Sequence, residues 1–199
     1  MSHRRMQIPF IKPFITLIRN MLIANQLKKK NRAEYLLYMW QVEDIIRAYH
    51  CDIDELKQHY LQQFNVDNNT RQQMETWYEN LCRMMQEEGL KETGHLQINK
   101  ICMQQLNELH LQLLQSTKFP YYRSTYYKIL PYIVELRSKN AKEETELQTC
   151  FDALYGVMML RLQKKDVSPE TEKATKDIST FLGMLSDYYL KNENEPIEF

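Results

Sequence analysis

Apolar side chains recur every three or four residues along most of this chain, and this spacing restricts it to α-helices. In residues 31–51, for example, one helical face carries Tyr35, Met39, Val42, Ile46 and Tyr49. No segment alternates apolar and polar side chains for long enough to predict a strand. Four glycines and six prolines in 199 residues also provide too few turns for a β architecture.

Capping and breaking residues divide the chain into separate helices. Asp52 with Glu55 predicts a helix start through a D-x-x-E capping box, and Ser168 followed by Pro169 predicts another. We therefore expect an all-α fold, a compact orthogonal or up-down bundle of about six to seven helices. Their predicted ranges are about 31–51, 52–64, 70–89, 95–118, 120–140, 141–162 and 169–192.

Residues 1–20 differ from the rest of the chain, with two prolines, a basic start and no helical period. Lys12 and Pro13 interrupt the apolar stretch, which disfavours a signal peptide. We interpret residues 1–20 as an N-terminal extension that packs weakly or is not native to the protein, because Met21 opens an ordinary-looking start. Residues 21–192 are predicted to form a single helical domain, and residues 193–199 a frayed tail.

The charge is unevenly distributed. Residues 1–32 contain eight basic and no acidic side chains, so the rest of the chain has a net charge of −8. The only basic run consists of Lys28, Lys29, Lys30 and Arg32, and we interpret it as a solvated helix entry. We therefore do not expect a nucleic-acid surface on the acidic body.

Four widely spaced cysteines and the absence of long apolar runs indicate a protein of the cytoplasm. Cys51, Cys82, Cys102 and Cys150 form no CxxC pair, so we expect reduced and mostly buried thiols. No apolar run approaches the roughly 18–20 residues that span a bilayer.

None of the familiar catalytic or cofactor motifs occurs. The chain lacks the glycine-rich phosphate loops GxxxxGK[ST] and GxGxxG, the GxSxG elbow, and the metal-binding HExxH and Glu-x-x-His spacings. We therefore predict no cofactor, no metal and no catalytic residue.

Charged residues at inward positions are the most specific candidates for a site. Glu43, Asp44 and Arg47 lie near the apolar line of the 31–51 helix, and Arg161 lies on that of the 141–162 helix. A buried charge is costly unless it is paired, so we expect Glu43 or Asp44 to pair with Arg161. Such a pair either fixes helix register or forms the floor of a pocket. The pocket wall would be Trp40, Tyr122 and Tyr126.

The segments MLIANQLKKKNRAEYLLYMWQVEDIIRAYH and ELQTCFDALYGVMMLRLQKKDVSPET resemble an uncharacterised family of short helical proteins from Bacteroidetes, a domain of unknown function. The resemblance covers about residues 21–190. It implies an all-α, cytoplasmic, single-domain protein, and it implies no reaction, cofactor or catalytic residue.

Two functions remain open from the sequence, and nucleic-acid contact through the basic run at residues 28–32 is a weaker third. An abundance of Tyr, Met and Trp without a catalytic constellation favours a non-enzymatic interaction module that self-associates or binds a protein partner. The alternative is a small-ligand-binding protein, or an enzyme, with a pocket between helices. A cavity of roughly 300 Å³ or more at Glu43 or Arg161 would favour this alternative.

Overall fold

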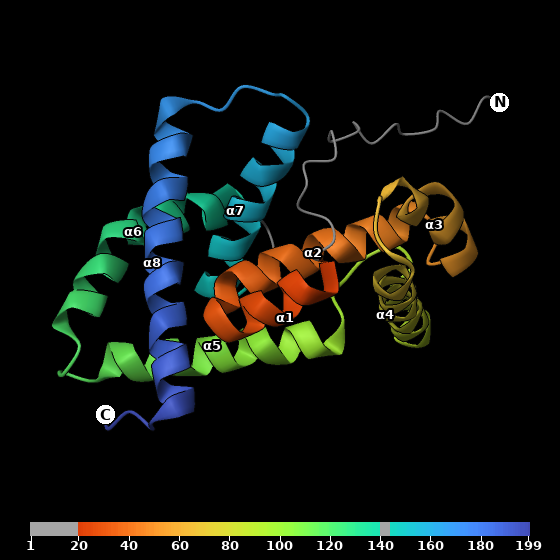
Figure 1. Cartoon of the computed structure of the whole chain (residues 1–199). Helices are drawn as coiled ribbons and strands as arrows, with labels where there is room; N and C mark the ends of the chain where they lie inside the picture. The colour runs from red at the N-terminus through yellow and green to blue at the C-terminus, as the bar shows by residue number, and fades with distance from the viewer. Residues whose placement is uncertain (1–19, 140–143) are drawn as a thin grey trace.

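The structure, a computed structural model, describes residues 20–139 and 144–199 (Figure 1). Over these residues it contains helices and no strand, which confirms the predicted all-α class. There are eight α-helices and one short 3-10 helix in the described residues, one α-helix more than the upper predicted count. They are α1 (Asn20–Lys30), α2 (Arg32–Ala48), α3 (Ile53–His59), η2 (Leu61–Gln63), α4 (Asn68–Glu87), α5 (Gln97–Gln115), α6 (Pro120–Lys139), α7 (Glu146–Leu162) and α8 (Pro169–Asn194).

The additional helix is α1, which ends on the basic run instead of leading into the next helix. Asn31 separates α1 from α2, and its side-chain oxygen accepts hydrogen bonds from the backbone N–H groups of Ala33 and Glu34. An N-cap of this kind starts a new helix, so the chain turns at Asn31. The predicted extension, apart from Asn20 at the start of α1, lies outside the described residues.

Two helices begin at the predicted cap residues, and two others begin at a different residue than predicted. Asp52 caps α3 and Ser168 caps α8, as predicted. Helix α4 begins at Asn68, two residues before its predicted start, because Asp67 provides the cap. Helix α7 is capped by Thr145, whereas the earlier start predicted for it falls at residues 140–143, which are not described.

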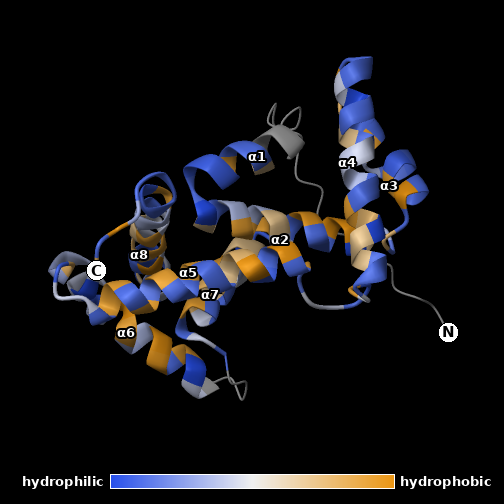
Figure 2. Cartoon of the chain, turned by 90° about the horizontal axis from the view of Figure 1, so that it is seen from below, coloured by the Kyte–Doolittle hydropathy of each residue, from blue (hydrophilic) through white to orange (hydrophobic). Residues whose placement is uncertain are grey.

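Helix α2 lies at the centre of the fold and contacts α1, α5 and α8. Its inward face includes Leu36 and Ile46, both 0% exposed. Burying such a side chain stabilises the fold by about 1.5–3 kcal/mol. Figure 2 shows α3 and α4 at one end of α2, apart from α6 and α8, and Figure 1 gives the same arrangement.

Helix α8 ends later than predicted, because its last turns are tied to α2. The guanidinium of Arg32 donates to the carboxylate of Glu193 at 2.6 Å, and the backbone N–H of Arg32 donates to the hydroxyl of Ser186 at 2.6 Å. Beyond the helix, the ring of Phe199 lies 5.9 Å from that of Phe119. Glu193 and Phe199, in the stretch predicted as a frayed tail, thus contact other parts of the chain.

Within the described residues, no helix combines the length and the apolar character needed to cross a membrane.

Candidate functional site

Glu43 is the most deeply buried charged residue among those described, and all its closest partners lie at the start of α5. The side chain of Glu43 is 0% exposed. Its Oε1 accepts from the backbone N–H of Leu96 at 2.9 Å and from Nδ2 of Asn99 at 2.7 Å. Its Oε2 lies 2.6 Å from Nδ1 of His95 and 3.9 Å from the guanidinium of Arg47. The carboxylate is therefore held by three hydrogen bonds and a nearby cation.

The start of α5 requires these contacts because the side chain of its own N-cap residue cannot accept a hydrogen bond from the backbone. Leu96 occupies the cap position and makes no side-chain cap bond. The first N–H groups of a helix have no partner within the helix, and they favour negative charge. Glu43 accepts from one of them, and the carboxylate of Glu88 accepts from the N–H of Gln97 at 2.7 Å. Two distant carboxylates thus replace the missing cap.

Arg47, one of the predicted residues, fixes the loop that leads into α5. Its guanidinium donates to the backbone oxygens of Leu90 (3.2 Å) and Gly94. Gly94 has φ +96°, and a Cβ added there would meet the side chain of Leu90 at 2.9 Å. Asp44 pairs with Arg47 at 2.6 Å. The loop conformation thus depends on glycine at residue 94, and it presents the next residue, His95, to Glu43.

His95 stacks on Trp40 in a rigid ring pair. The ring centroids lie 4.2 Å apart with an interplanar angle of 16°. The contact between Oε2 of Glu43 and Nδ1 of His95 holds the imidazole ring in this position. Trp40 also contacts the rings of Phe151 and Tyr155, at 5.9 and 5.6 Å.

A cavity of about 350 Å³ lies beside this ring pair, between α2, α5 and the start of α7. Its wall is mainly apolar, with amide and charged groups interspersed. This volume is within the range of small-molecule sites. The lining residues are Trp40, His95, Asn99, Lys100, Met103, Gln104, Asn107, Glu144, Thr145 and Gln148.

Asn99 is a lining residue whose side chain is almost entirely buried. The residue is 1% exposed, and its Nδ2 is engaged by Glu43. Its Oδ1 is buried and has no hydrogen-bond partner. The contact with Glu43 fixes the orientation of the amide, because two acceptors facing each other would repel. Unsatisfied buried polar atoms are rare in folded proteins, and each calls for a physical reason.

Two carboxyl groups lie on the α7 side of the cavity. Glu144 lines the cavity, and Asp152 accepts a hydrogen bond from Gln148 at 2.8 Å. Burial of the carboxyl group and the adjacent Glu144 raise the pKa of Asp152 to about 6, although part of the Asp152 side chain is exposed.

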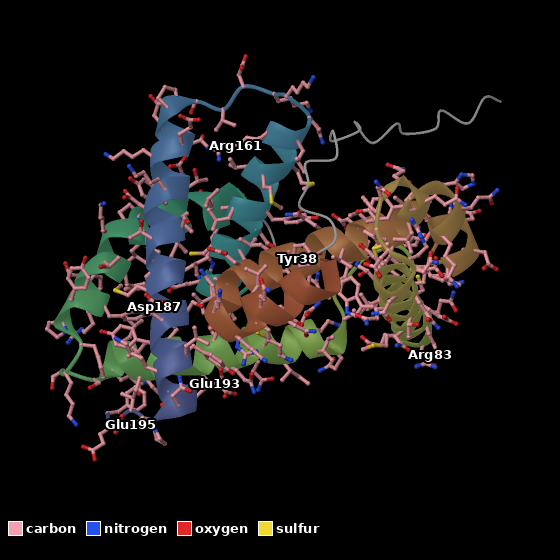
Figure 3. The ribbon with its side chains drawn as sticks, in the orientation of Figure 1. Tyr38, Arg83, Arg161, Asp187, Glu193 and Glu195 are labelled. Atoms are coloured by element: carbon pink, nitrogen blue, oxygen red, sulfur yellow. The ribbon has the colours of Figure 1, made fainter. Side chains whose placement is uncertain are left out.

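The predicted pairing of Arg161 with Glu43 or Asp44 is wrong. The side chain of Arg161 is 59% exposed, and its guanidinium lies 3.6 Å from the carboxylate of Glu172 on α8. Figure 3 places Arg161 near the end of α7 that leads into α8. Helical spacing gave the correct face of α7, but the last turn of the helix extends beyond the core. Glu43, Asp44 and Arg47 do lie together.

Of the three residues predicted for a pocket wall, Trp40 lines the cavity, whereas the two tyrosines lie elsewhere. Tyr122 is 0% exposed, and its hydroxyl lies 2.7 Å from Nδ1 of His110. Tyr126 is 8% exposed and donates to the carboxylate of Glu146 at 2.6 Å. They form a second polar cluster in the core of α5 and α6. Burial there lowers the pKa of His110 to about 4.

The basic run divides into two environments. Lys28, Lys29 and Lys30 are exposed at the end of α1, whereas Arg32 is buried and paired with Glu193. Only three of the four cations therefore reach the surface.

Sequence reasoning missed His95 and Asn99, the two residues that link Glu43 to the cavity. A usable signal was the absence of any capping side chain at Leu96, which implies that the cap comes from another helix. Within residues 20–139 and 144–199, no three His, Cys, Asp or Glu side chains are placed to hold a metal ion.

Fold and site together define an all-α protein with a cavity between helices, backed by a buried carboxylate. The chain belongs to the family described as domain of unknown function DUF4924, whose model matches residues 21–196. This match confirms the resemblance to a domain of unknown function, and it begins at Met21. No curated protein and no solved structure matches the chain.

Proposed function

We propose that this protein binds a small organic molecule in the cavity between α2, α5 and α7. The observation that carries the proposal is the ring pair of His95 and Trp40 on the cavity wall. Binding sites combine an apolar concave surface with a few fixed polar groups. Here the buried carboxylate of Glu43 fixes the polar groups before any ligand arrives.

Helix capping alone accounts for only part of this arrangement. It explains why Glu43 accepts from Leu96. It does not explain why the same carboxylate also orients His95 against Trp40 beside a cavity. A ligand accounts for this feature, because preorganised rings lower the cost of binding.

The test is a fragment screen observed at the tryptophan side chains. The chain contains two tryptophans, Trp40 at the cavity and Trp77 on α4, so a Trp77→Phe variant assigns the two indole N–H signals. We expect the fragments that bind to shift the Trp40 signal. We also expect Asn107→Phe, which fills the cavity, to abolish those shifts.

The matched control is Asn80→Phe, the same exchange at an exposed position of α4 away from the cavity. It should leave fragment binding unchanged. A screen whose hits shift only Trp77, or whose hits bind equally well to the Asn107→Phe variant, would contradict the proposal.

A second function, self-association as an interaction module, is favoured by an exposed apolar line on α6. Tyr127 and Val134 are 56% and 61% exposed, and Pro131 between them is exposed as well. At spacings of four and seven residues these side chains share one face. A second copy of the chain that packs on this face would bury them, with the two α6 helices as the interface.

Sedimentation or light scattering tests this second function directly. We expect the wild-type chain to form a dimer and a Tyr127→Glu/Val134→Lys variant to be monomeric. Glu79→Lys, on the exposed face of α4, controls for a change in surface charge. A wild-type chain that stays monomeric at high concentration would refute it.

The cytoplasm is the compartment that we propose for this protein. Support comes from Cys51, Cys82, Cys102 and Cys150, which are all buried and free of disulfides. Free buried thiols are typical of reducing compartments. Cell fractionation that found the protein outside the cytoplasm would contradict this assignment.

A further inference from the structure

We infer that Tyr155 on α7 is a positioning residue of this cavity, because its single side chain holds both rings of the pair on the cavity wall. The inference rests on the proposed binding function for its purpose, and its test needs no ligand. Six side chains form a closed cycle of contacts that includes the ring pair. They are Trp40, Glu43, Asp44, Arg47, His95 and Tyr155.

Helix α2 supplies four members of this cycle from one face. They lie three or four residues apart, a spacing that places side chains next to one another on a helix. These four are Trp40, Glu43, Asp44 and Arg47. Tyr155 contacts this face at two points one helical turn apart, with its ring at Trp40 and with its hydroxyl at Asp44.

The ring of Tyr155 supports Trp40 directly. The two ring centroids lie 5.6 Å apart, and the interplanar angle of 77° makes the contact edge-to-face. Aromatic rings prefer this geometry, which also restricts the tilt of the indole. The ring of Tyr155 therefore helps to fix the member of the ring pair that α2 supplies.

The hydroxyl of Tyr155 acts on His95 through two charged side chains. It donates to Oδ2 of Asp44, and Arg47 donates to Oδ1 of the same carboxylate at 2.6 Å. Burial and the hydrogen bond to Asp44 raise the pKa of Tyr155, so the hydroxyl keeps the proton that it donates. Arg47 in turn donates to the backbone oxygen of Gly94, the residue before His95. The hydroxyl is thus connected to the loop that carries the second ring.

A simple tie between α7 and α2 does not account for these contacts. Helix α7 already packs in the core through Leu147 and Phe151, which are 1% and 0% exposed. Asp44 is 49% exposed, and polar pairs at such positions add little to stability. The hydroxyl of Tyr155 therefore matters more for the position of Arg47 than for the folding of the chain.

The experiment follows the ring pair by NMR in the ligand-free chain. Tyr155→Phe keeps the ring against Trp40 and removes only the hydroxyl. The N–H of Leu96 is bonded to Glu43, and we expect its hydrogen exchange to become roughly threefold to tenfold faster, the range for the loss of one hydrogen bond. We also expect the Trp40 indole signal to shift, because the His95 ring moves relative to it.

The matched control is Tyr189→Phe. It removes a hydroxyl that donates to Gln105 at 2.8 Å, and neither residue lines the cavity. A general loss of stability accelerates exchange in the whole core, including the amide of Leu185 on α8, whereas a loss of positioning accelerates it at Leu96 relative to Leu185. The control should leave both this ratio and the Trp40 signal unchanged.

A double substitution tests whether Tyr155 acts through Asp44. Asp44→Ala removes the middle link at an exposed position and should accelerate exchange at Leu96 at least as much as Tyr155→Phe does. Adding Tyr155→Phe to Asp44→Ala should then change the rate by less than about twofold, because contacts in one network are not additive.

Three results would overturn the inference. They are an unchanged exchange rate at Leu96 in Tyr155→Phe, an equal acceleration at Leu185, and effects of Tyr155→Phe and Asp44→Ala that multiply in the double variant. None of them bears on whether the cavity binds a molecule. A failure of the binding function is recognised separately, by a fragment screen without hits at Trp40.

Discussion

Replacing Glu43 with leucine should be among the most destabilising single substitutions in this chain. The exchange fills a similar volume but removes the acceptor for Leu96 N–H and for Asn99 Nδ2, both of which are buried. An unsatisfied buried donor costs about 1–3 kcal/mol, and removing one member of a buried charged group costs about 3–5 kcal/mol. His95 loses its partner as well, but it is partly exposed and can turn toward water.

We therefore expect Glu43→Leu to lower the free energy of unfolding by about 4 kcal/mol. For a chain of this length that corresponds to a drop of about 10 °C in Tm. Glu43→Gln keeps one side-chain oxygen, which can still accept from two of the three donors around Glu43. It should therefore lower the free energy of unfolding by about 1–2 kcal/mol. Urea unfolding followed by circular dichroism measures both, and an unchanged m-value would show that the native state is intact.

The matched control is Asp44→Asn, one residue along the same helix. Asp44 is 49% exposed and pairs with Arg47 at the surface, so its replacement should cost less than about 1 kcal/mol. The reasoning fails if Glu43→Leu costs no more than Asp44→Asn. In that case the three contacts of the buried carboxylate would not stabilise the start of α5.

Three further predictions concern other parts of the fold. Because His110 is buried with a pKa of about 4, it binds protons more readily in the unfolded chain, so acid should destabilise the protein. Between pH 6.5 and pH 4 this residue should cost about 3 kcal/mol, a loss absent from His110→Gln in pH-dependent urea titrations. The raised pKa of Asp152 acts in the opposite direction: its ionised form is disfavoured in the fold, so stability falls as pH rises through about 6. Asp152→Asn should therefore be more stable than wild type at pH 7.5, by less than about 1 kcal/mol after solvent screening, and should lose this advantage below about pH 4. Ser186→Ala leaves the backbone N–H of Arg32 buried without its acceptor, and thermal unfolding should detect a loss of about 1–3 kcal/mol, with Ser138→Ala on the exposed face of α6 as the control.

Short-range sequence patterns predicted the helices and the burial of individual residues well. Asp52 and Ser168 were recognisable as caps because a capping bond spans only two or three residues. The burial of Glu43 followed from its helical face, because spacing along one helix determines which side chains point inward. These inferences need no knowledge of any other element.

The sequence did not predict in the same way which residues on different helices contact one another. Arg161 and Glu43 each lie on an inward-facing line, but Arg161 is 59% exposed at the end of α7 and lies near Glu172 of α8 instead. Tyr122 and Tyr126 face the core, yet they pack with His110 and not at the cavity. A helical pattern gives the direction of a side chain and contains no information on which helix lies opposite.

The sequence by itself therefore determined that this protein is helical, where most of its helices begin, and that Glu43 is buried. Only the tertiary structure decided that Glu43 binds Leu96 and Asn99, which lie 53 and 56 residues further along the chain, and that a cavity opens beside them. The reason is physical. Helix formation and capping are set by contacts within a few residues, whereas a cavity and its fixed acceptors arise only from the angles at which whole helices pack.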